Sequence, residues 1–432
     1  MEKLIQFISA NCDKDTSRLI LDRKKYPDID MDLAVNCIES RRKLKGKVQE
    51  WYEEPRLIFP LKLSAEQCSS SATGAYKAQV AEAIAVRSLD CARDDRREDA
   101  RDDRREGARD ERREWTIADL TGGLGVDSWF FSKKAAKVIY NEMQTPLCQA
   151  ASLNFKTLGA GNIEIINSTA AQGNIGKITG DRVDIVYMDP ARRGEGGKKV
   201  FLIEDCTPDV LTLRDEIFRY TDNILIKLSP MADISMVCDR LGPACREVHV
   251  VSTAGECKEL LIWMNSGWKE EYTIIATELH NNAPAAQFIF KPSEERSATC
   301  HACITPGRTH LLFEPGKALM KAGAYNLIAQ RYGLDKLGKS THYYLAESAQ
   351  EADMLKPYGK VFSIIECQPL SKQSIREFGK RYPKSEVTAR NIPMDTDTLR
   401  KKSGITSGDD AHIFGLKSDR DGNILIAAKR VF

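Results

Sequence analysis

The chain has 432 residues, of which 42% are hydrophobic and 29% charged, and its 64 Lys and Arg nearly balance 62 Asp and Glu. This composition is typical of a soluble globular protein, and the length predicts about two to four domains. No apolar run approaches the roughly 20 residues of a membrane span and no signal peptide is recognisable, so we expect a cytoplasmic protein with no membrane partner.

The 12 cysteines are spread over the whole chain, which favours reduced thiols over a disulfide framework. Cys300 and Cys303 have the spacing of a ligand pair, but a zinc site would need a second pair, and only scattered histidines such as His280 and His310 are nearby. We therefore predict that no metal is required.

Residues 1–115 are predicted to form a helical N-terminal domain, because amphipathic groupings recur between prolines. The stretch 59–77 is unusually rich in small polar residues. Ser64 with Gln67 has the pattern of a capping box at a helix start. The alternative is that this stretch covers a cofactor or lines a substrate entrance, through the residues Gln67, Ser69, Ser70, Thr73 and Lys77.

Residues 92–114 repeat a unit of the form A-R-D-(D/E)-R-R-E three times. Acids and arginines nearly balance and recur three and four residues apart, so the insert is predicted to be a solvated spacer, either an exposed helix or disordered. A role in binding nucleic acid is the less favoured alternative, because a positive field needs unbalanced charge.

Residues 116–266 alternate short apolar runs with amphipathic helical stretches, which predicts a mainly parallel sheet of Rossmann-like α/β type. Seven strands are expected, at 117–120, 137–140, 163–166, 184–188, 223–228, 247–252 and 259–264. The last two have no room for a helix between them, so they should form an antiparallel hairpin.

The first of these strands lies in W-T-I-A-D-L-T-G-G-L-G-V-D-S, residues 115–128. Three glycines, Gly122, Gly123 and Gly125, let the backbone turn and approach a ligand. A dinucleotide fingerprint would have a further glycine at position 128, where this chain has Ser128. With Asp119 at the strand end, the loop instead resembles motif I of the class I S-adenosylmethionine methyltransferases.

This resemblance implies that S-adenosyl-L-methionine is the cofactor. Thr121 and Asp127 would then bind its methionine part, and Glu142, at the end of the second strand, would accept hydrogen bonds from the ribose hydroxyls. Met143 would cover the adenine. At the end of the third strand, where an acid is frequent in such enzymes, this chain offers Ser168 and Thr169.

The fourth strand ends in Asp189, Pro190, Ala191 and Arg192, and the proline should present the acid rigidly at the carboxyl edge of the sheet. D-P-A-R resembles the (D/N)-P-P-(Y/F) motif of methyltransferases that act on nitrogen. There the acid aligns the target amine with the methyl group. Ala191 and Arg192 depart from that motif, and Arg192 or Arg193 could stack on a base or hold a phosphate instead.

A related D-P-P-R turn occurs in enzymes that methylate C5 of a pyrimidine, and these need a cysteine nucleophile. The fifth strand here is followed by Ser229, which is too weakly ionised for that role, and Cys206 lies at a predicted helix cap. Nitrogen is therefore the favoured target.

Beyond the sheet, residues 267–347 are predicted to form a small α+β unit of ferredoxin-like type, and residues 348–432 a basic α/β domain. From residue 356 onward Lys and Arg number 15 against 9 Asp and Glu, an excess compatible with a phosphate backbone or with a merely solvated basic face. D-G-N at 421–423 predicts a hairpin between the last two strands.

Together with the helical N-terminus, D-L-T-G-G-L-G-V-D, Y-M-D-P-A-R-R, L-F-E-P-G-K-A-L-M-K-A-G and the basic C-terminal piece resemble the THUMP-like domain-containing class I methyltransferases of Bacteroidetes-type bacteria. THUMP and ferredoxin-like modules in related enzymes dock RNA, so the resemblance implies an RNA partner, either tRNA or rRNA, N-methylated on a base.

Three alternatives remain open at this point. The sheet could bind the cofactor and RNA without turnover, the acceptor could be DNA, protein or a small molecule, or the fold could serve a nicotinamide-dependent oxidoreductase, which Ser128 disfavours. The sequence predicts no particular oligomeric state.

Overall fold

The computed structural model describes residues 2–99, 114–192, 202–280, 286–300, 306–307 and 310–431. Most of the charged repeats, Arg193 and Cys303 lie outside these ranges. The chain divides into two compact units, one comprising Met1–Arg246 and Leu260–Glu270, the other Glu247–Glu259 and Glu271–Phe432. The division falls within two long strands, Cys245–Thr253 and Glu256–Asn265.

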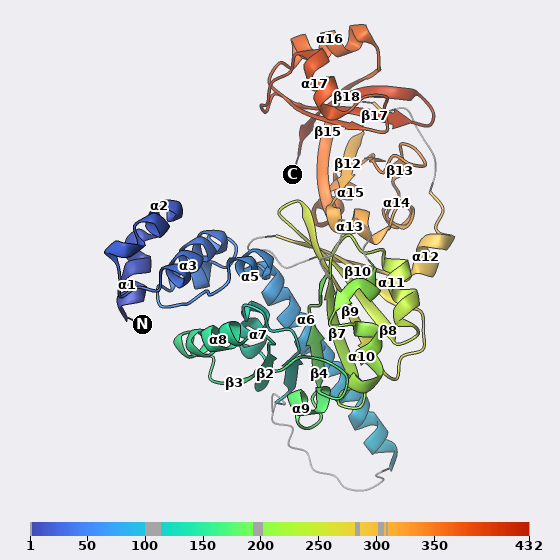
Figure 1. The fold of residues 1–432 in the computed structure, drawn as a ribbon. Coiled ribbons are helices and arrows are strands. Elements are labelled where there is room, and N and C mark those ends of the chain that lie inside the picture. The colour runs from blue at the N-terminus through green and yellow to red at the C-terminus, as the bar shows by residue number, and fades with distance from the viewer. Residues whose placement is uncertain are drawn as a thin grey trace. The chain divides into compact units, whose positions relative to one another are not determined.

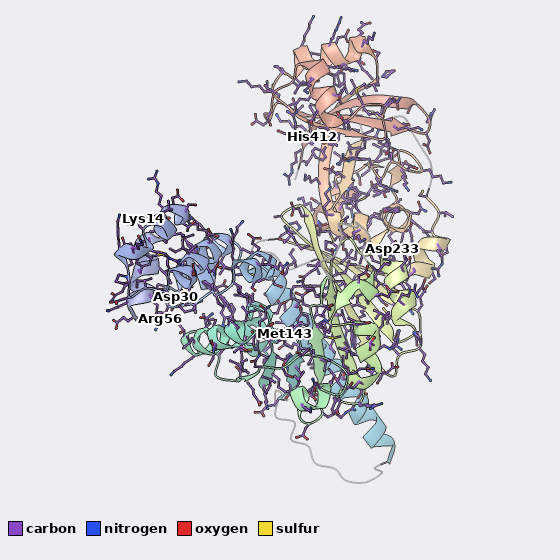
Figure 2. All side chains as sticks on the ribbon, in the orientation of Figure 1. Lys14, Asp30, Arg56, Met143, Asp233 and His412 are labelled. Carbon is purple, nitrogen blue, oxygen red and sulfur yellow. The ribbon has the colours of Figure 1, made fainter. Side chains whose placement is uncertain are left out.

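The first unit begins with helices, as predicted (Figure 1): α1 (Glu2–Asn11), α2 (Thr16–Leu21), η1 (Arg23–Lys25), α3 (Met31–Leu44), α4 (Gln49–Glu53), α5 (Lys62–Gln67) and α6 (Ser71–Asp99). Aspartates begin two of them: Asp15 caps α2, and Asp30, labelled in Figure 2, accepts from the Leu33 amide at the start of α3. The first part of the repeats continues α6, which matches the helical alternative for those residues.

The predicted capping box at Ser64 is wrong. Helix α5 already begins at Lys62, and Leu61 stands at its N-cap without a side-chain hydrogen bond. Ser64 therefore lies inside the first turn, where its hydroxyl cannot cap the helix.

A mainly parallel sheet follows. Its strands in the predicted region are β1 (Thr116–Asp119), β2 (Lys137–Asn141), β3 (Ile163–Ile166), β4 (Ile185–Met188), β7 (Asn223–Leu228), β8 (Cys245–Thr253) and β9 (Glu256–Asn265). β1 pairs in parallel with β2 and β4, and β4 with β7, whereas β9 runs antiparallel to β7. All seven expected strands are present. As predicted, the last of them, β9, runs antiparallel to its neighbour.

The strand count is a correction, because the sheet has nine strands in the order β11-β10-β8-β9-β7-β4-β1-β2-β3. β10 (Thr273–Leu279) pairs in parallel with β8, and β11 (Ala286–Phe290) pairs antiparallel with β10. The sequence pattern predicts both strands in the following α+β unit, because the alternation of apolar residues marks strands but does not reveal which sheet they join.

Short helices connect these strands: α7 (Val126–Ser132), α8 (Thr145–Thr157), α9 (Ile175–Thr179), η2 (Ile203–Asp205), α10 (Val210–Ile217) and α11 (Ile234–Leu241). The turn after β4 forms a small ladder, β5 (Ala191–Arg192) against β6 (Cys206–Thr207). The central strands β1, β4 and β7 are buried nearly throughout, as expected for a sheet covered on both faces, whereas the edge strand β3 has no buried residue. No helix of the described residues is both long and apolar enough to span a bilayer.

The second unit continues with α12 (Pro292–Ser297), β12 (Leu311–Pro315), α13 (Lys317–Ala322), α14 (Leu327–Tyr332), β13 (Asp335–Lys336), β14 (Tyr344–Ala346), α15 (Ala349–Leu355), η3 (Lys356–Tyr358), β15 (Gly359–Pro369), α16 (Lys372–Arg381), β16 (Glu386–Arg390), α17 (Thr396–Ser403), β17 (His412–Ser418) and β18 (Gly422–Arg430). Seven strands form one sheet, β13-β14-β12-β15-β18-β17-β16. The predicted hairpin of β17 and β18 is present, with Gly422 at φ +71°.

Candidate cofactor-binding and active site

The glycine loop after β1 is pressed against the end of β2. A Cβ on Gly122 would lie 2.2 Å from the ring of Tyr140, and one on Gly125 would lie 2.6 Å from Phe155. Gly125 also has φ +94°, which other residues rarely adopt. The Tyr140 hydroxyl donates to the Gly123 carbonyl at 2.6 Å. The glycines are therefore required for packing of the loop itself, in addition to the ligand approach predicted from the sequence.

Asp119 anchors the loop from inside. Its side chain is buried and accepts from the Thr121 amide at 3.0 Å and from the Ser128 hydroxyl at 2.6 Å. Burial raises the pKa of Asp119 to about 7, with the charges of Asp127 and Asp189 acting in the same direction. Ser128 is therefore a hydrogen-bond donor to the buried acid. The sequence pattern shows only that position 128 lacks a glycine.

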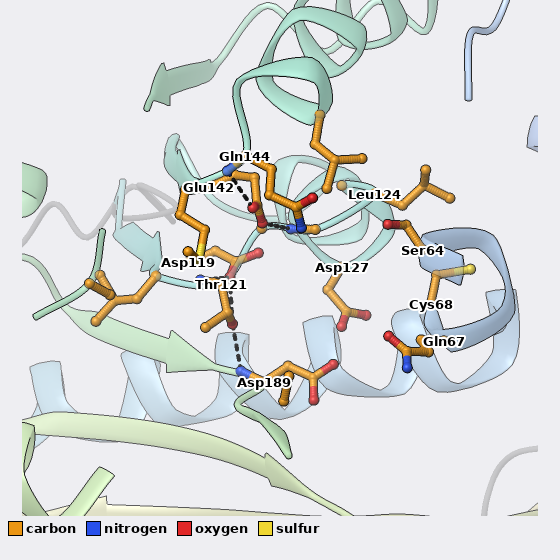
Figure 3. A pocket seen from close by; sticks show the side chains of 18 of the residues that line it. Ser64, Gln67, Cys68, Asp119, Thr121, Leu124, Asp127, Glu142, Gln144 and Asp189 are labelled. Atoms are coloured by element: carbon orange, nitrogen blue, oxygen red, sulfur yellow. Dashed lines mark hydrogen bonds between the residues drawn. The ribbon is translucent and has the colours of Figure 1, made fainter. Parts of the chain in front are cut away.

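The D-P-A-R turn is fixed to the glycine loop. Thr121 Oγ1 accepts from the backbone amide of Asp189 at 2.6 Å, and the ammonium of Lys227 lies 2.5 Å from Asp189 Oδ2 (Figure 3 shows the former contact). Lys227 is on β7, so three neighbouring strands converge on this point. The sequence analysis missed Lys227, although a lysine at the end of a strand next to the D-P-A-R strand was the available signal.

Glu142 follows β2 and is buried. Its two oxygens accept from the amides of Gly123 at 2.9 Å and Gln144 at 2.8 Å. The carboxylate is therefore held at the rim of the glycine loop, with lone pairs to spare for other donors. Met143, labelled in Figure 2, is 61% exposed.

Asp127 lies in the first turn of α7 and meets the helical part of the unit. Ser69 donates to Asp127 Oδ2 at 3.0 Å, Tyr187 donates to the same oxygen at 2.8 Å, and the Lys77 ammonium is 3.2 Å from Oδ1. Burial opposes ionisation, but the charges of Lys77 and Lys227 and the hydroxyl hydrogen bonds together hold the pKa of Asp127 below its ordinary value.

These groups surround one cavity of about 240 Å³ (Figure 3). Its lining includes every residue predicted to bind the cofactor, namely Asp119, Thr121, Gly122, Gly123, Gly125, Asp127, Glu142, Met143, Ser168 and Thr169. Of the predicted catalytic turn, Asp189 and Ala191 line the cavity and Pro190 does not, and the side chain of Arg192 lies outside the described part of the structure.

The helical segment also reaches this cavity. Ser64, Gln67, Cys68 and Ser69 line one side of it, and Figure 3 shows Gln67 on the same opening as Asp127 and Asp189. Of the five residues in the alternative that gives 59–77 a place over a cofactor, Gln67 and Ser69 line the cavity, whereas Ser70, Thr73 and Lys77 do not. No aromatic side chain lines the cavity within the described ranges.

No cluster of three or more potential metal ligands occurs among the described residues. Cys300 is a free thiol near Asn326, and its partner in the C-x-x-C pair lies outside the described ranges.

Two family models match the C-terminal part of the chain: residues 311–352 match a ferredoxin-like domain and residues 359–430 a THUMP domain-like family. The chain is also similar over its full length to a crystal structure from Porphyromonas gingivalis W83, a protein provisionally assigned as a methyltransferase. The identity is 27%, the TM-score 0.81, and the match covers 100% of this chain and 98% of that one. The resemblance to THUMP-like methyltransferases, and the α/β fold with ferredoxin-like and THUMP-like modules, are thereby confirmed.

Two further similarities are partial. A provisionally assigned methyltransferase from Streptococcus mutans in complex with SAH is 15% identical over 35% of this chain and 88% of that one, at a TM-score of 0.27. A SAM-dependent methyltransferase from Agrobacterium tumefaciens is 18% identical over 36% of this chain and 57% of that one, at 0.28. Such low scores support no conclusion about this chain. No curated protein matches it.

Proposed function

We propose that this chain is an S-adenosyl-L-methionine-dependent methyltransferase that N-methylates a base in tRNA or rRNA. The observation that carries the proposal is the convergence of an acid-anchored glycine loop, the Glu142 carboxylate and the Asp189 turn on a single cavity. The similarity to the Porphyromonas gingivalis protein supports the same class of activity.

The residues present fit this cofactor. The loop approaches the cavity as bare backbone at Gly122 and Gly123, and the Glu142 carboxylate stands at its rim, where ribose hydroxyls can donate to it. Thr121 and Asp127 would hold the methionine end, and Ser168 and Thr169 the adenine edge. When bound, the cofactor supplies a methyl group already activated by the sulfonium.

The chain's own contribution to transfer is alignment. Asp189 would accept a hydrogen bond from the target amine, and Pro190 and the Thr121 contact keep the turn from shifting. The ammonium of Lys227 is held by Asp189 Oδ2, so we assign Asp189 Oδ1 to the target amine. Arg192 follows Ala191 in this turn, and we assign its guanidinium to a phosphate or a base of the RNA.

An RNA acceptor is supported by the second unit. A cavity of about 230 Å³ there is lined by residues from both matched domains, including Lys317, His342 and Arg390. Neither Lys317 nor Arg390 forms an ion pair with a described residue, and Glu314, which also lines the cavity, lies 3.8 Å from Lys360. Burial lowers the pKa of His342 to about 4, so its ring is neutral near pH 7. The two cations of the lining therefore outnumber its one acid, which suits a phosphate.

The test is transfer of a labelled methyl group to total RNA from a strain that lacks the protein. Asp189→Ala should abolish transfer while the affinity for S-adenosylhomocysteine stays within about twofold, because the acid is assigned to the acceptor. Asp215→Ala, an exposed acid on α10 with 78% of its side chain accessible, is the matched control. Loss of cofactor affinity together with transfer would show that Asp189 is misassigned.

The alternative of cofactor binding without turnover makes a different prediction. The wild-type protein would then bind S-adenosylhomocysteine but label none of the RNA, whatever residue stands at position 189.

A further inference from the structure

We propose that Lys77 of α6 is a positioning residue for the amino-acid end of the cofactor site, so that the helical N-terminal segment is an integral part of that site. This inference rests on the proposed cofactor, and it adds residues of the helical segment that the methyltransferase motifs do not include.

The geometry places Lys77 behind the cavity wall. Its side chain is fully buried, and its ammonium donates to the Ser69 hydroxyl at 2.7 Å and lies 3.2 Å from Asp127 Oδ1. Ser69 in turn donates to Asp127 Oδ2 at 3.0 Å. Ser69 and Asp127 both line the cavity, whereas Lys77 does not. Lys77 can therefore act on a ligand through these two side chains rather than by lining the cavity itself.

A buried ammonium is costly unless it is paired and hydrogen-bonded, so the position of Lys77 demands its partners. Asp127 in turn depends on Lys77, because the Lys77 charge is one of the groups that keep the buried Asp127 ionised. With Lys77 in place, the Ser69 hydroxyl has its proton directed at Asp127 and its lone pairs at the ammonium. Both cavity groups are thus fixed in orientation and charge before any ligand arrives.

We assign the network to one end of the proposed cofactor. Glu142 and the residues after β3 are assigned to the adenosine part, whereas Thr121 and Asp127 are assigned to the methionine part. The Ser69–Lys77–Asp127 network therefore touches only the end that would hold the amino and carboxyl groups of the ligand. The affinity for a ligand that lacks the amino and carboxyl groups should therefore not depend on Lys77.

A purely structural role for Lys77 can be distinguished from the proposed positioning role by a second variant. Helix α6 also packs on α7 at Gly74, where a Cβ would lie 2.4 Å from the ring of Phe130. Gly74→Ala therefore disturbs the packing of the same two helices without removing any member of the network. It serves as the matched control.

The experiment is calorimetric titration of the full chain with two probes, S-adenosylhomocysteine and 5′-methylthioadenosine. The second keeps the adenosine and the thioether sulfur but lacks the amino-acid end. Lys77→Met should weaken S-adenosylhomocysteine binding about tenfold or more, the size of a lost charge-assisted interaction, and leave methylthioadenosine within about twofold. Gly74→Ala should affect both ligands in parallel or neither.

Ser69→Ala provides a second variant in case Lys77→Met does not fold, since it removes one hydroxyl and leaves the ion pair. It should show the same selective loss at a smaller size. Equal weakening of both probes by these variants, or unchanged binding of S-adenosylhomocysteine, would overturn the inference. If the wild-type protein bound neither probe, the proposed function would fail and the inference with it.

Discussion

Replacement of Asp119 by Asn should change how the stability of the first unit depends on pH. Asn keeps an oxygen for the Thr121 amide and an NH₂ group for the Ser128 hydroxyl, so both hydrogen bonds of the loop anchor survive. What the variant removes is only the ability to ionise. It therefore isolates the cost of charging a side chain that is 1% exposed.

The direction of this pH dependence follows from the raised pKa of Asp119. The pKa of Asp119 is about 7 in the folded chain against an ordinary value of 3.8, because burial disfavours the carboxylate. Between these values the folded protein retains a proton that the unfolded chain has released, so the free energy of unfolding falls as pH rises. At 1.36 kcal/mol per pH unit, a shift of about three units amounts to about 4 kcal/mol, lost between about pH 4 and pH 7. The Asn variant escapes this loss.

The assay is urea unfolding of both proteins from pH 4.5 to pH 8, followed by tryptophan fluorescence. All five tryptophans (Trp51, Trp115, Trp129, Trp263 and Trp268) belong to the first unit, so the signal reports that unit. The wild type should lose stability relative to the variant as pH rises. A difference that is constant over this range, or one that grows in favour of the wild type, would refute the assignment of a buried, protonated Asp119.

Three further outcomes are expected. Glu142→Gln should weaken S-adenosylhomocysteine binding about tenfold, because one oxygen and the negative charge offered to the ribose are lost. Ser128→Ala should lower the free energy of unfolding of the first unit by about 1–3 kcal/mol, since it removes the 2.6 Å donor to the buried Asp119. Lys317→Glu combined with Arg390→Glu should weaken binding of bulk tRNA and reduce the salt dependence of that binding by about one to two phosphate contacts, with S-adenosylhomocysteine affinity unchanged.

Matched controls exist for these variants. Glu164→Gln changes an acid on β3 that is half exposed and paired with Lys137, and it should leave cofactor affinity unaltered. Lys356→Glu changes a partly exposed cation of the second unit that does not line its cavity. If Lys356→Glu weakened tRNA binding as much as Lys317→Glu with Arg390→Glu, general charge rather than the cavity would account for the effect.

Much of the first sheet could be predicted from the sequence, because buried parallel strands leave short apolar runs that end in chemically distinctive residues. Asp119, Glu142 and Asp189 all follow such runs, and all line the same cavity. The same local pattern could not assign β10 and β11 to their sheet, since pairing is decided by contacts far along the chain.

The parts that sequence reasoning missed are those that depend on what a side chain meets in space. In the sequence, Ser128 shows only that a glycine is absent at this position, but in the structure its hydroxyl donates to Asp119. The sequence pattern gives Lys227 no role, yet in the structure it pairs with Asp189. The small polar residues of 59–77 suggested a helix cap at Ser64, and only the packing of α6 on α7 reveals that Ser69 and Lys77 reach Asp127.

The central claim is that the cavity binds S-adenosyl-L-methionine. Its most direct test is a titration of the wild-type chain with S-adenosylhomocysteine and, in parallel, with NAD. The structure of the glycine loop, with Ser128 buried at the position of the third glycine, predicts saturable binding of S-adenosylhomocysteine at one site and no binding of NAD. Binding of NAD, or failure to bind S-adenosylhomocysteine, would contradict the account.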